Sequence, residues 1–301
     1  MLSLFKKNEN FLLACFIATI GSLGNVIHAV LLKYYSAKLS VNLYELVFLN
    51  CIVEIIVLFP FCIKNIFSTK SKQQIFIVIL LAILYSMDIL LYNTGLKTVS
   101  INTGTLIMLL VPLWMCFFGK VILKEHGFDM INAICLLLCI FAVIITIYGD
   151  IKIDHFSIGV LLIFINSIVL PIGVILQKKF SDTRPIIYAL WSNAFMLGLF
   201  SFFLSGCSVD IIKNINRDKI VCAIIIAMSD MMECGGVYLS CKLAKVSSLQ
   251  PIRFTRIIFA ILISRIILGE NTTYHQIIGI SIILISNFAS IIYSKKKHYS
   301  N

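Results

Sequence analysis

The sequence predicts an all-α, polytopic membrane protein of ten transmembrane helices, arranged as two five-helix halves of opposite orientation. Its mean hydropathy is +1.01, and 60% of its 301 residues are hydrophobic while 13% are charged, which is far more apolar than the core of a soluble domain requires. Short polar breaks divide the chain into ten apolar segments, and an internal similarity relates its two halves. The expected halves are residues 1–150 and 151–301.

Each predicted span has about 20 mainly apolar residues, the length that crosses the hydrocarbon layer as a helix. The spans are expected at 11–32, 41–63, 74–95, 99–119, 128–148, 156–176, 185–206, 219–240, 247–268 and 274–293. The longest polar connections, 64–73 and 207–218, are too short for a tethered soluble catalytic domain. The first span follows Lys6 and Lys7, but its apolar run exceeds that of a signal peptide and more spans follow, so we expect it to be retained.

The basic residues indicate membrane topology. The formal net charge is +11, but lysine and arginine are spread through the loops, whereas nucleic-acid binding needs a concentrated patch. If the N-terminus is inside, the inside breaks carry more of these residues than the outside breaks, so the positive-inside rule places both termini in the cytoplasm. We expect a multi-pass protein of a bacterial-type inner membrane, as a monomer or a homodimer.

The ten cysteines fall almost entirely within the predicted spans, without a CxxC pair or a metal-like spacing. Small apolar packing is their expected role. The sequence therefore predicts no bound metal and no cofactor.

An internal similarity relates two stretches of the chain. "LKTVSINTGTLIMLLVPLW" begins at Leu96, and "LAKVSSLQPIRFTRIIFAI" begins at Leu243. Each continues through an apolar span to a glutamate, Glu125 or Glu270, and then to a short break and another span. Because five is an odd number of spans, the second copy enters the membrane from the opposite face. Inverted repeats of this kind are common in transporters, which bind their substrates near the midplane between the halves.

The proline of the fourth span, the paired glutamate motifs and a following glycine together indicate a family. Pro112, "ILKE" ending at Glu125, "ILGE" ending at Glu270, and Gly279 resemble the EamA-type branch of the drug/metabolite transporter superfamily. The resemblance covers the whole chain through its helix count and repeat. It implies a ten-helix transporter of small metabolites.

Two further details are similar to the bacterial S-adenosylmethionine uptake transporters within that branch. One is the P-x-R of Pro251 and Arg253, and the other is the E-x-V-F that begins at Glu45. The chain departs from these relatives at Asn50, where many carry arginine, and at Ile257, where the second-half counterpart of the first-half proline is expected.

The spans also contain charged residues, namely Glu45, Glu54, Asp88, Asp230, Glu233, Arg253, Arg256 and Arg265. A charge at the bilayer centre costs about 2.5–3.5 kcal/mol even on the lenient insertion scale, so the deep charges must face each other or water. Arg265 and Glu45 lie near the outer ends of their helices, where Arg265 can reach the interface. The remaining residues of this set are candidates for function.

The spacing of four deep charges predicts a cluster. Arg253 and Arg256 are three residues apart, and Asp230 and Glu233 repeat that spacing on the preceding span. In an antiparallel hairpin the depths match, which pairs Asp230 with Arg256 and Glu233 with Arg253. Two interpretations stay open: the ion pairs hold the hairpin together, or the cluster binds a zwitterionic substrate whose carboxylate meets the guanidinium groups.

Asp88 and Glu54 lie near mid-membrane without a basic neighbour in their own half. A carboxyl group in that setting can hold a proton, which makes Asp88 the preferred candidate for coupling transport to a proton gradient. A neutral carboxyl hydrogen-bonded to a nearby asparagine or tyrosine is the alternative. Tyr92 and Asn93 follow Asp88 and are expected to line the same cavity.

Three other span residues have simpler expected roles. His28, alone on an apolar helix, is expected to be a hydrogen-bonded packing residue. Pro112 and Pro171 are expected to interrupt the fourth and sixth helices at mid-membrane.

These observations favour a secondary transporter of a small metabolite that works by alternating access. Uptake of S-adenosylmethionine is the preferred assignment, and export of amino acids or drugs is the alternative within the superfamily. A non-transporting membrane receptor is the alternative from another class. An enzyme is not expected, since the sequence has no HExxH, no Ser/His or Ser/Lys pair and no DxxD-like run.

Overall fold

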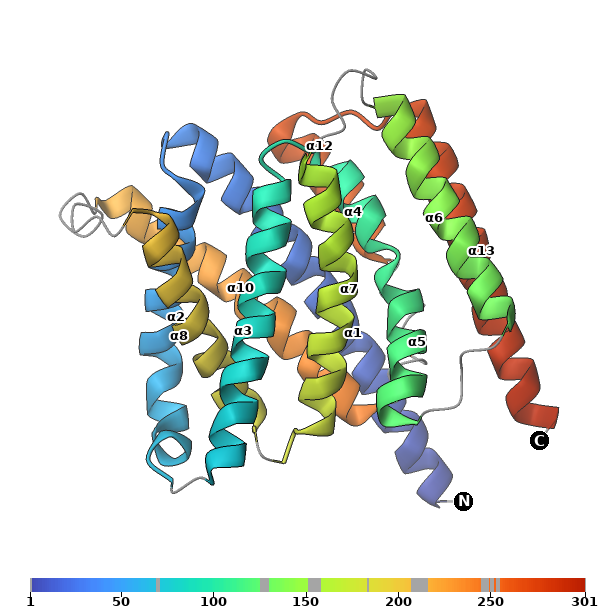
Figure 1. Ribbon diagram of the computed structural model, residues 1–301, viewed down its shortest axis with the longest axis horizontal. Helices are drawn as coiled ribbons and strands as arrows, with labels where there is room; N and C mark the ends of the chain where they lie inside the picture. The colour runs from blue at the N-terminus through green and yellow to red at the C-terminus, as the bar shows by residue number, and fades with distance from the viewer. Residues whose placement is uncertain are drawn as a thin grey trace.

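The computed structural model describes residues 2–68, 71–124, 130–150, 158–182, 184–206, 216–244, 249, 252 and 255–300, and the regular structure in these residues is helical (Figure 1). The helices are α1 (Leu2–Lys38), α2 (Leu43–Ile66), α3 (Lys72–Gly95), α4 (Ile101–Met108), α5 (Val111–Leu123), α6 (Met130–Asp150), α7 (Ile158–Lys179), α8 (Ile186–Leu204), α10 (Arg217–Leu243), α12 (Thr255–Leu268) and α13 (Tyr274–Ser300). A helix lies at each of the ten predicted positions, and α4 and α5 together occupy the fourth.

Within the described residues, seven helical segments are long and apolar enough to cross a membrane. They are Phe11–Lys38, Leu43–Ile66, Lys72–Gly95, Ile101–Leu123, Ile158–Lys179, Ile186–Leu204 and Arg217–Leu243. The other three predicted spans correspond to α6, α12 and α13, which are not among these seven. The chain is therefore an all-helical, multi-pass membrane protein.

The helices pack mainly against partners from the other half of the chain. α1 packs along α10, α2 along α8, α3 along α7, and α6 along α13. Figure 1 shows α6 and α13 side by side at one end of the bundle, while α1 and α10 cross its centre. The central contacts are thus made between residues far apart in sequence.

Glycines bring α1 and α10 to backbone contact. A Cβ atom added at Gly236 would lie 2.7 Å from the Cα of Gly21, and one added at Gly24 would lie 2.8 Å from the backbone nitrogen of Glu233. Small residues allow this close approach between membrane helices, where packing and not hydrophobicity drives association. Because the two helices run antiparallel at this distance, short polar side chains on either helix reach across the interface.

The fourth span is broken at Pro112. α4 ends at Met108 and α5 begins at Val111, so that Pro112 stands in the first turn of α5. Proline lacks an N–H and its ring collides with the carbonyl four residues earlier, which ends the preceding helix. The break predicted there is confirmed, whereas the one predicted at Pro171 is wrong, since Pro171 lies inside a continuous α7.

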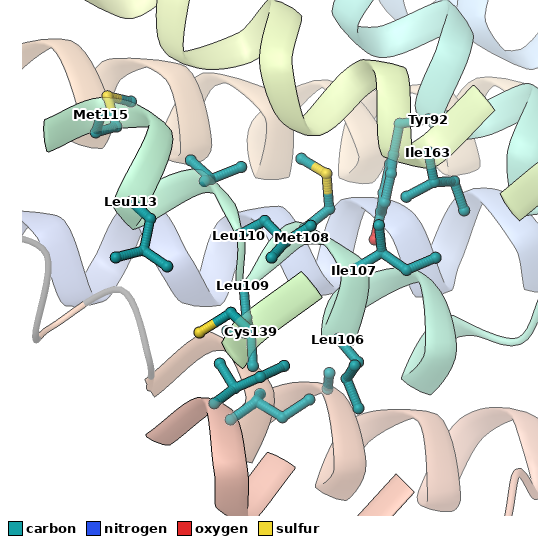
Figure 2. Close-up of a cluster of buried hydrophobic side chains, with 14 of the residues drawn as sticks. Tyr92, Leu106, Ile107, Met108, Leu109, Leu110, Leu113, Met115, Cys139 and Ile163 are labelled. Carbon is teal, nitrogen blue, oxygen red and sulfur yellow. The ribbon is translucent and has the colours of Figure 1, made fainter. Parts of the chain in front are cut away.

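Apolar side chains fill the space around this break. Figure 2 shows Leu106, Ile107, Leu109, Leu110 and Leu113 of the α4–α5 region in one buried cluster, which includes Cys139 of α6 and Ile163 of α7. Cys139, like most of the described cysteines, is buried, in agreement with a packing role.

The start of α4 is tied to the other half of the chain by Glu270. Its carboxylate accepts hydrogen bonds from the backbone N–H groups of Ile101, at 3.2 and 3.0 Å, and of Asn102, at 3.4 Å. Lys33 at the end of α1 donates to Glu270 Oε1 at 3.0 Å and to the carbonyl of Val99 at 3.1 Å. A carboxylate at a helix N-terminus satisfies unpaired N–H groups and the helix dipole.

The turn between α7 and α8 is organised by Arg184, which is 1% exposed. Its guanidinium donates to Gln177 at 2.9 Å, to Ser192 at 2.8 Å, to the carbonyl of Ala189 at 3.2 Å, and to Asn193. Desolvation lowers the pKa of Arg184 to about 10. Arg184 lies in a short connection between two spans, and the structure makes it a buried hydrogen-bonding centre.

Replacing Gly236 by alanine is expected to destabilise the protein. Its Cβ would meet the backbone of Gly21, which cannot move aside as a flexible side chain can, and overpacking of this kind costs about 1–3 kcal/mol. Gly235→Ala is the matched control, because a Cβ there meets only Leu190 Cδ1 at 3.9 Å. The melting temperature in detergent should fall for Gly236→Ala and hold for Gly235→Ala; equal values would contradict the close α1–α10 contact.

Replacing Glu270 by alanine should cost about 1–2 kcal/mol of stability, because the first turn of α4 loses its acceptor and Lys33 loses its partner. Glu270→Gln keeps an acceptor oxygen but not the charge, and is expected to lose about half as much. Thermal unfolding of both variants checks this order. If the two substitutions were equally harmless, Glu270 would not be anchoring α4.

Candidate functional site

A cavity lies where the two halves of the chain meet. Its walls come from α1, from the break between α4 and α5, and from α7, α10 and α12. The space between atoms, including that open to the mouth, is about 550 Å³. The lining residues are Ala18, Gly21, Ser22, Asn25, Met108, Leu109, Val111, Pro112, Leu170, Glu233, Val237, Ser240 and Arg256. This lining is mostly apolar, and among the described residues it carries one acidic side chain, Glu233, and one basic side chain, Arg256.

The two charged lining residues keep unused hydrogen-bonding capacity. Asn25 Nδ2 donates to Glu233 Oε1, while Glu233 Oε2 has no hydrogen-bond partner among the described residues. Arg256 Nε and Nη2 likewise have none within the described part of the chain, although the guanidinium lies 5.5 Å from the ring centroid of Tyr92. A bound solute with an anionic and a cationic group could satisfy both residues.

Asn25 and Glu233 form the first of two polar contacts across the α1–α10 interface. One turn further along each helix, His28 Nδ1 lies 3.9 Å from Asp230 Oδ1. The shared three-residue spacing follows from the antiparallel packing, since residues i and i+3 lie on one face of a helix. The glycine contact thus places two polar pairs in register.

Asp230 belongs to a second group of buried side chains. The hydroxyl of Tyr85 donates to its two oxygens at 3.0 and 2.8 Å, and the thiol of Cys234 donates to the Tyr85 oxygen at 3.2 Å. Glu54 of α2 lies within hydrogen-bond reach of Asp230. Among the predicted site residues, Glu54 and Asp230 therefore lie together, apart from the cavity lining.

The predicted pairing of Asp230 with Arg256 is wrong. Both residues are described, and they do not form an ion pair. The prediction assumed that consecutive spans pack as a hairpin, whereas α10 and α12 each pack on α1. The other predicted pair cannot be placed, because Arg253 lies outside the described residues.

The remaining predicted residues lie on α3, close to the cavity. Asp88 is partly buried and interacts with Asn166 of α7, and it lies within electrostatic range of Glu233 and Arg256. Tyr92 is 5% exposed and faces the guanidinium of Arg256. Asn93 is buried, and its amide nitrogen has no hydrogen-bond partner among the described residues.

Sequence reasoning missed Asn25 and assigned His28 to simple packing. His28 is 2% exposed, and neither ring nitrogen has a hydrogen-bond partner among the described residues, so it is not the hydrogen-bonded packing residue that was expected. A signal was present: Ser22, Asn25 and His28 follow one another at three-residue spacing on an otherwise apolar span. A polar stripe of this kind marks the face of a membrane helix that meets protein or water.

Comparison with known proteins gives the fold and the family. The EamA-like transporter family matches the chain twice, over residues 12–148 and 157–292. A solved crystal structure superposes with a TM-score of 0.63 at 12% identity, over 93% of this chain and 98% of that one, which supports the fold alone. No curated protein sequence matches. Because the two family matches cover both halves, the chain belongs to the EamA-like transporter family of membrane proteins.

Proposed function

We propose that the protein is a secondary transporter that moves a small zwitterionic or cationic metabolite by alternating access. Its fold would be ten spans in a 5+5 inverted repeat, with halves at 1–150 and 151–301. The helix packing supports this arrangement. In this repeat α1 is equivalent to α7, α2 to α8, α3 to α10, and α6 to α13. A two-fold axis in the membrane plane therefore requires that the α1–α10 contact be matched by an α7–α3 contact, and that α2 pack on α8 and α6 on α13. All of these contacts are present.

The unsatisfied charges of the cavity carry this proposal. A substrate carboxylate would accept hydrogen bonds from Arg256, whose guanidinium fork suits bidentate binding. A cationic group of the substrate would meet the free oxygen of Glu233. Asp88, Tyr92 and Asn93 would form the wall behind Arg256, and Arg253 is a second candidate for the carboxylate.

S-adenosylmethionine is the substrate we propose first. It combines an amino-acid carboxylate and ammonium with a sulfonium cation, so Arg256 would take the carboxylate and Glu233 or Asp88 a positive group. The P-x-R and E-x-V-F resemblance supports this choice. The protein would lie in a bacterial-type inner membrane with both termini in the cytoplasm, as a monomer or homodimer.

Uptake of radiolabelled S-adenosylmethionine into cells that express the protein tests the proposal. Wild type should show saturable uptake, and Arg256→Met and Glu233→Gln should each lose about tenfold or more, since each removes a charged hydrogen-bond partner worth about 1.5–3 kcal/mol. Arg265→Met is the matched control, because Arg265 lies on the same helix with an exposed side chain. Expression in the membrane is compared by immunoblot.

The outcomes separate the parts of the proposal. Normal uptake in both variants would remove the cavity charges from substrate binding. No uptake by wild type would rule out this substrate, and efflux of amino acids or drugs would then be measured. Binding without counterflow in proteoliposomes would indicate a receptor in place of a transporter.

A further inference from the structure

Behind the cavity wall lies a buried group of ionisable side chains from four helices. Glu54 of α2, Asp230 of α10, Tyr85 of α3 and His28 of α1 are 3%, 2%, 8% and 2% exposed. The carboxyl groups of Glu54 and Asp230 lie within hydrogen-bond reach of each other. These side chains do not line the cavity, so substrate contacts do not explain them.

The hydrogen bonds around the two carboxyl groups do not balance two negative charges. Asp230 accepts from the Tyr85 hydroxyl, and Glu54 accepts from Asn50 Nδ2 at 3.4 Å. Within the described part of the chain, His28 is the basic residue at ion-pair distance from Asp230. Two buried carboxylates side by side repel strongly, as in the dyads of aspartic proteases, and one proton between them converts the repulsion into a hydrogen bond.

We propose that Glu54 and Asp230 share one proton and that, with His28, they form a proton-binding site that couples transport to the proton gradient. The coupling part rests on the proposed transport function, whereas the shared proton does not. The ligand of this site is a proton, carried between two carboxyl oxygens and available to an imidazole nitrogen.

His28 supplies the independent observation. Both of its ring nitrogens lack hydrogen-bond partners among the described residues, and Nδ1 points toward Asp230 at 3.9 Å. A buried imidazole without partners is costly unless it has a use. A rotation of the His28 side chain toward Asp230 would close the 3.9 Å gap and let the shared proton pass from the carboxyl oxygen to Nδ1, leaving two carboxylates beside an imidazolium and conserving charge.

The other ionisable groups near Glu54 and Asp230 are consistent with a proton shared by the pair. α2 also brings Cys51, and α3 and α10 bring Asp88, Cys234 and Glu233, all neutral or acidic. Arg256 of α12 lies within electrostatic range of Asp88 and Glu233. The tyrosine of α8, Tyr188, lies near Arg184 instead.

Asp88, the coupling residue expected from the sequence, fits this role less well. Asp88 is only partly buried, it interacts with Asn166, and it lies within electrostatic range of the basic Arg256 as well as of Glu233. Where Asp88 has Arg256 nearby, Glu54 and Asp230 each have the carboxyl group of the other. The pair also adjoins the cavity, because Asp230 lies one turn from Glu233 on α10 and His28 lies one turn from Asn25 on α1. Gain or loss of the proton would therefore change the electrostatic potential at the side chains that contact the substrate.

Infrared spectroscopy of the protein in lipid nanodiscs tests the shared proton without a substrate. Wild type at neutral pH should show the C=O stretch of a protonated carboxyl, although an isolated carboxyl ionises near pH 4. Glu54→Gln should remove that band, because it removes one of the two carboxyl groups between which the proton is held. Asp230→Asn should shift it, because the proton remains on Glu54 but loses its carboxylate acceptor. Glu45→Gln is the matched control on the same helix and should leave the spectrum unchanged.

The infrared spectra test the shared proton independently of any transport measurement. A band unchanged in Glu54→Gln, in Asp230→Asn and in the double variant would overturn the proposal, as would its removal by Asp88→Asn. For coupling, wild-type uptake should rise with an imposed proton gradient, and Glu54→Gln should keep counterflow but lose that response. A retained response would overturn the coupling role. If wild type transports no S-adenosylmethionine while the spectra behave as expected, the substrate assignment fails and the proton site stands.

Discussion

The contact between α1 and α10 at Gly21, Gly24 and Gly236 is the constraint on which the centre of the protein depends. Only glycine allows the two backbones to approach so closely. That approach lets Asn25, with its short side chain, reach Glu233 and brings His28 to Asp230. A wider spacing would leave these four polar groups to face lipid or empty space, at a cost of several kcal/mol.

The charged residues of the protein are stabilised in different ways, and the differences separate their roles. Arg184 is surrounded by hydrogen-bond acceptors from its own turn, which indicates a structural residue. Glu270 ties α4 to the second half through backbone N–H groups and Lys33. Glu233 and Arg256 line the cavity with a carboxylate oxygen and guanidinium nitrogens that have no hydrogen-bond partner within the described ranges. A charge that the protein itself leaves incompletely satisfied is the one available to a ligand.

The sequence was sufficient for properties that depend on local composition. The positions of the helices follow from hydropathy, and the break at Pro112 follows from the missing N–H of proline. The partners of the charges could not be predicted in this way. The prediction that paired Asp230 with Arg256 had the correct three-residue spacing but the wrong partner helix. α10 packs against α1, which lies about 200 residues earlier in the chain. Glu270 and Lys33 are joined over a similar separation.

The proposed inverted repeat explains why the acidic residues gather where they do. α3 and α10 are equivalent helices of the two halves, and each carries an acid where it crosses a helix of the other half, Asp88 on α3 and Glu233 on α10. α3 and α10 also meet each other, where the hydroxyl of Tyr85 donates to the carboxylate of Asp230. At each crossing an asparagine meets an acid: Asn25 with Glu233, and Asn166 with Asp88. Because the group that α3 brings to Asp230 is a hydroxyl and not a third carboxyl, the proposed single proton is enough to balance Glu54 and Asp230.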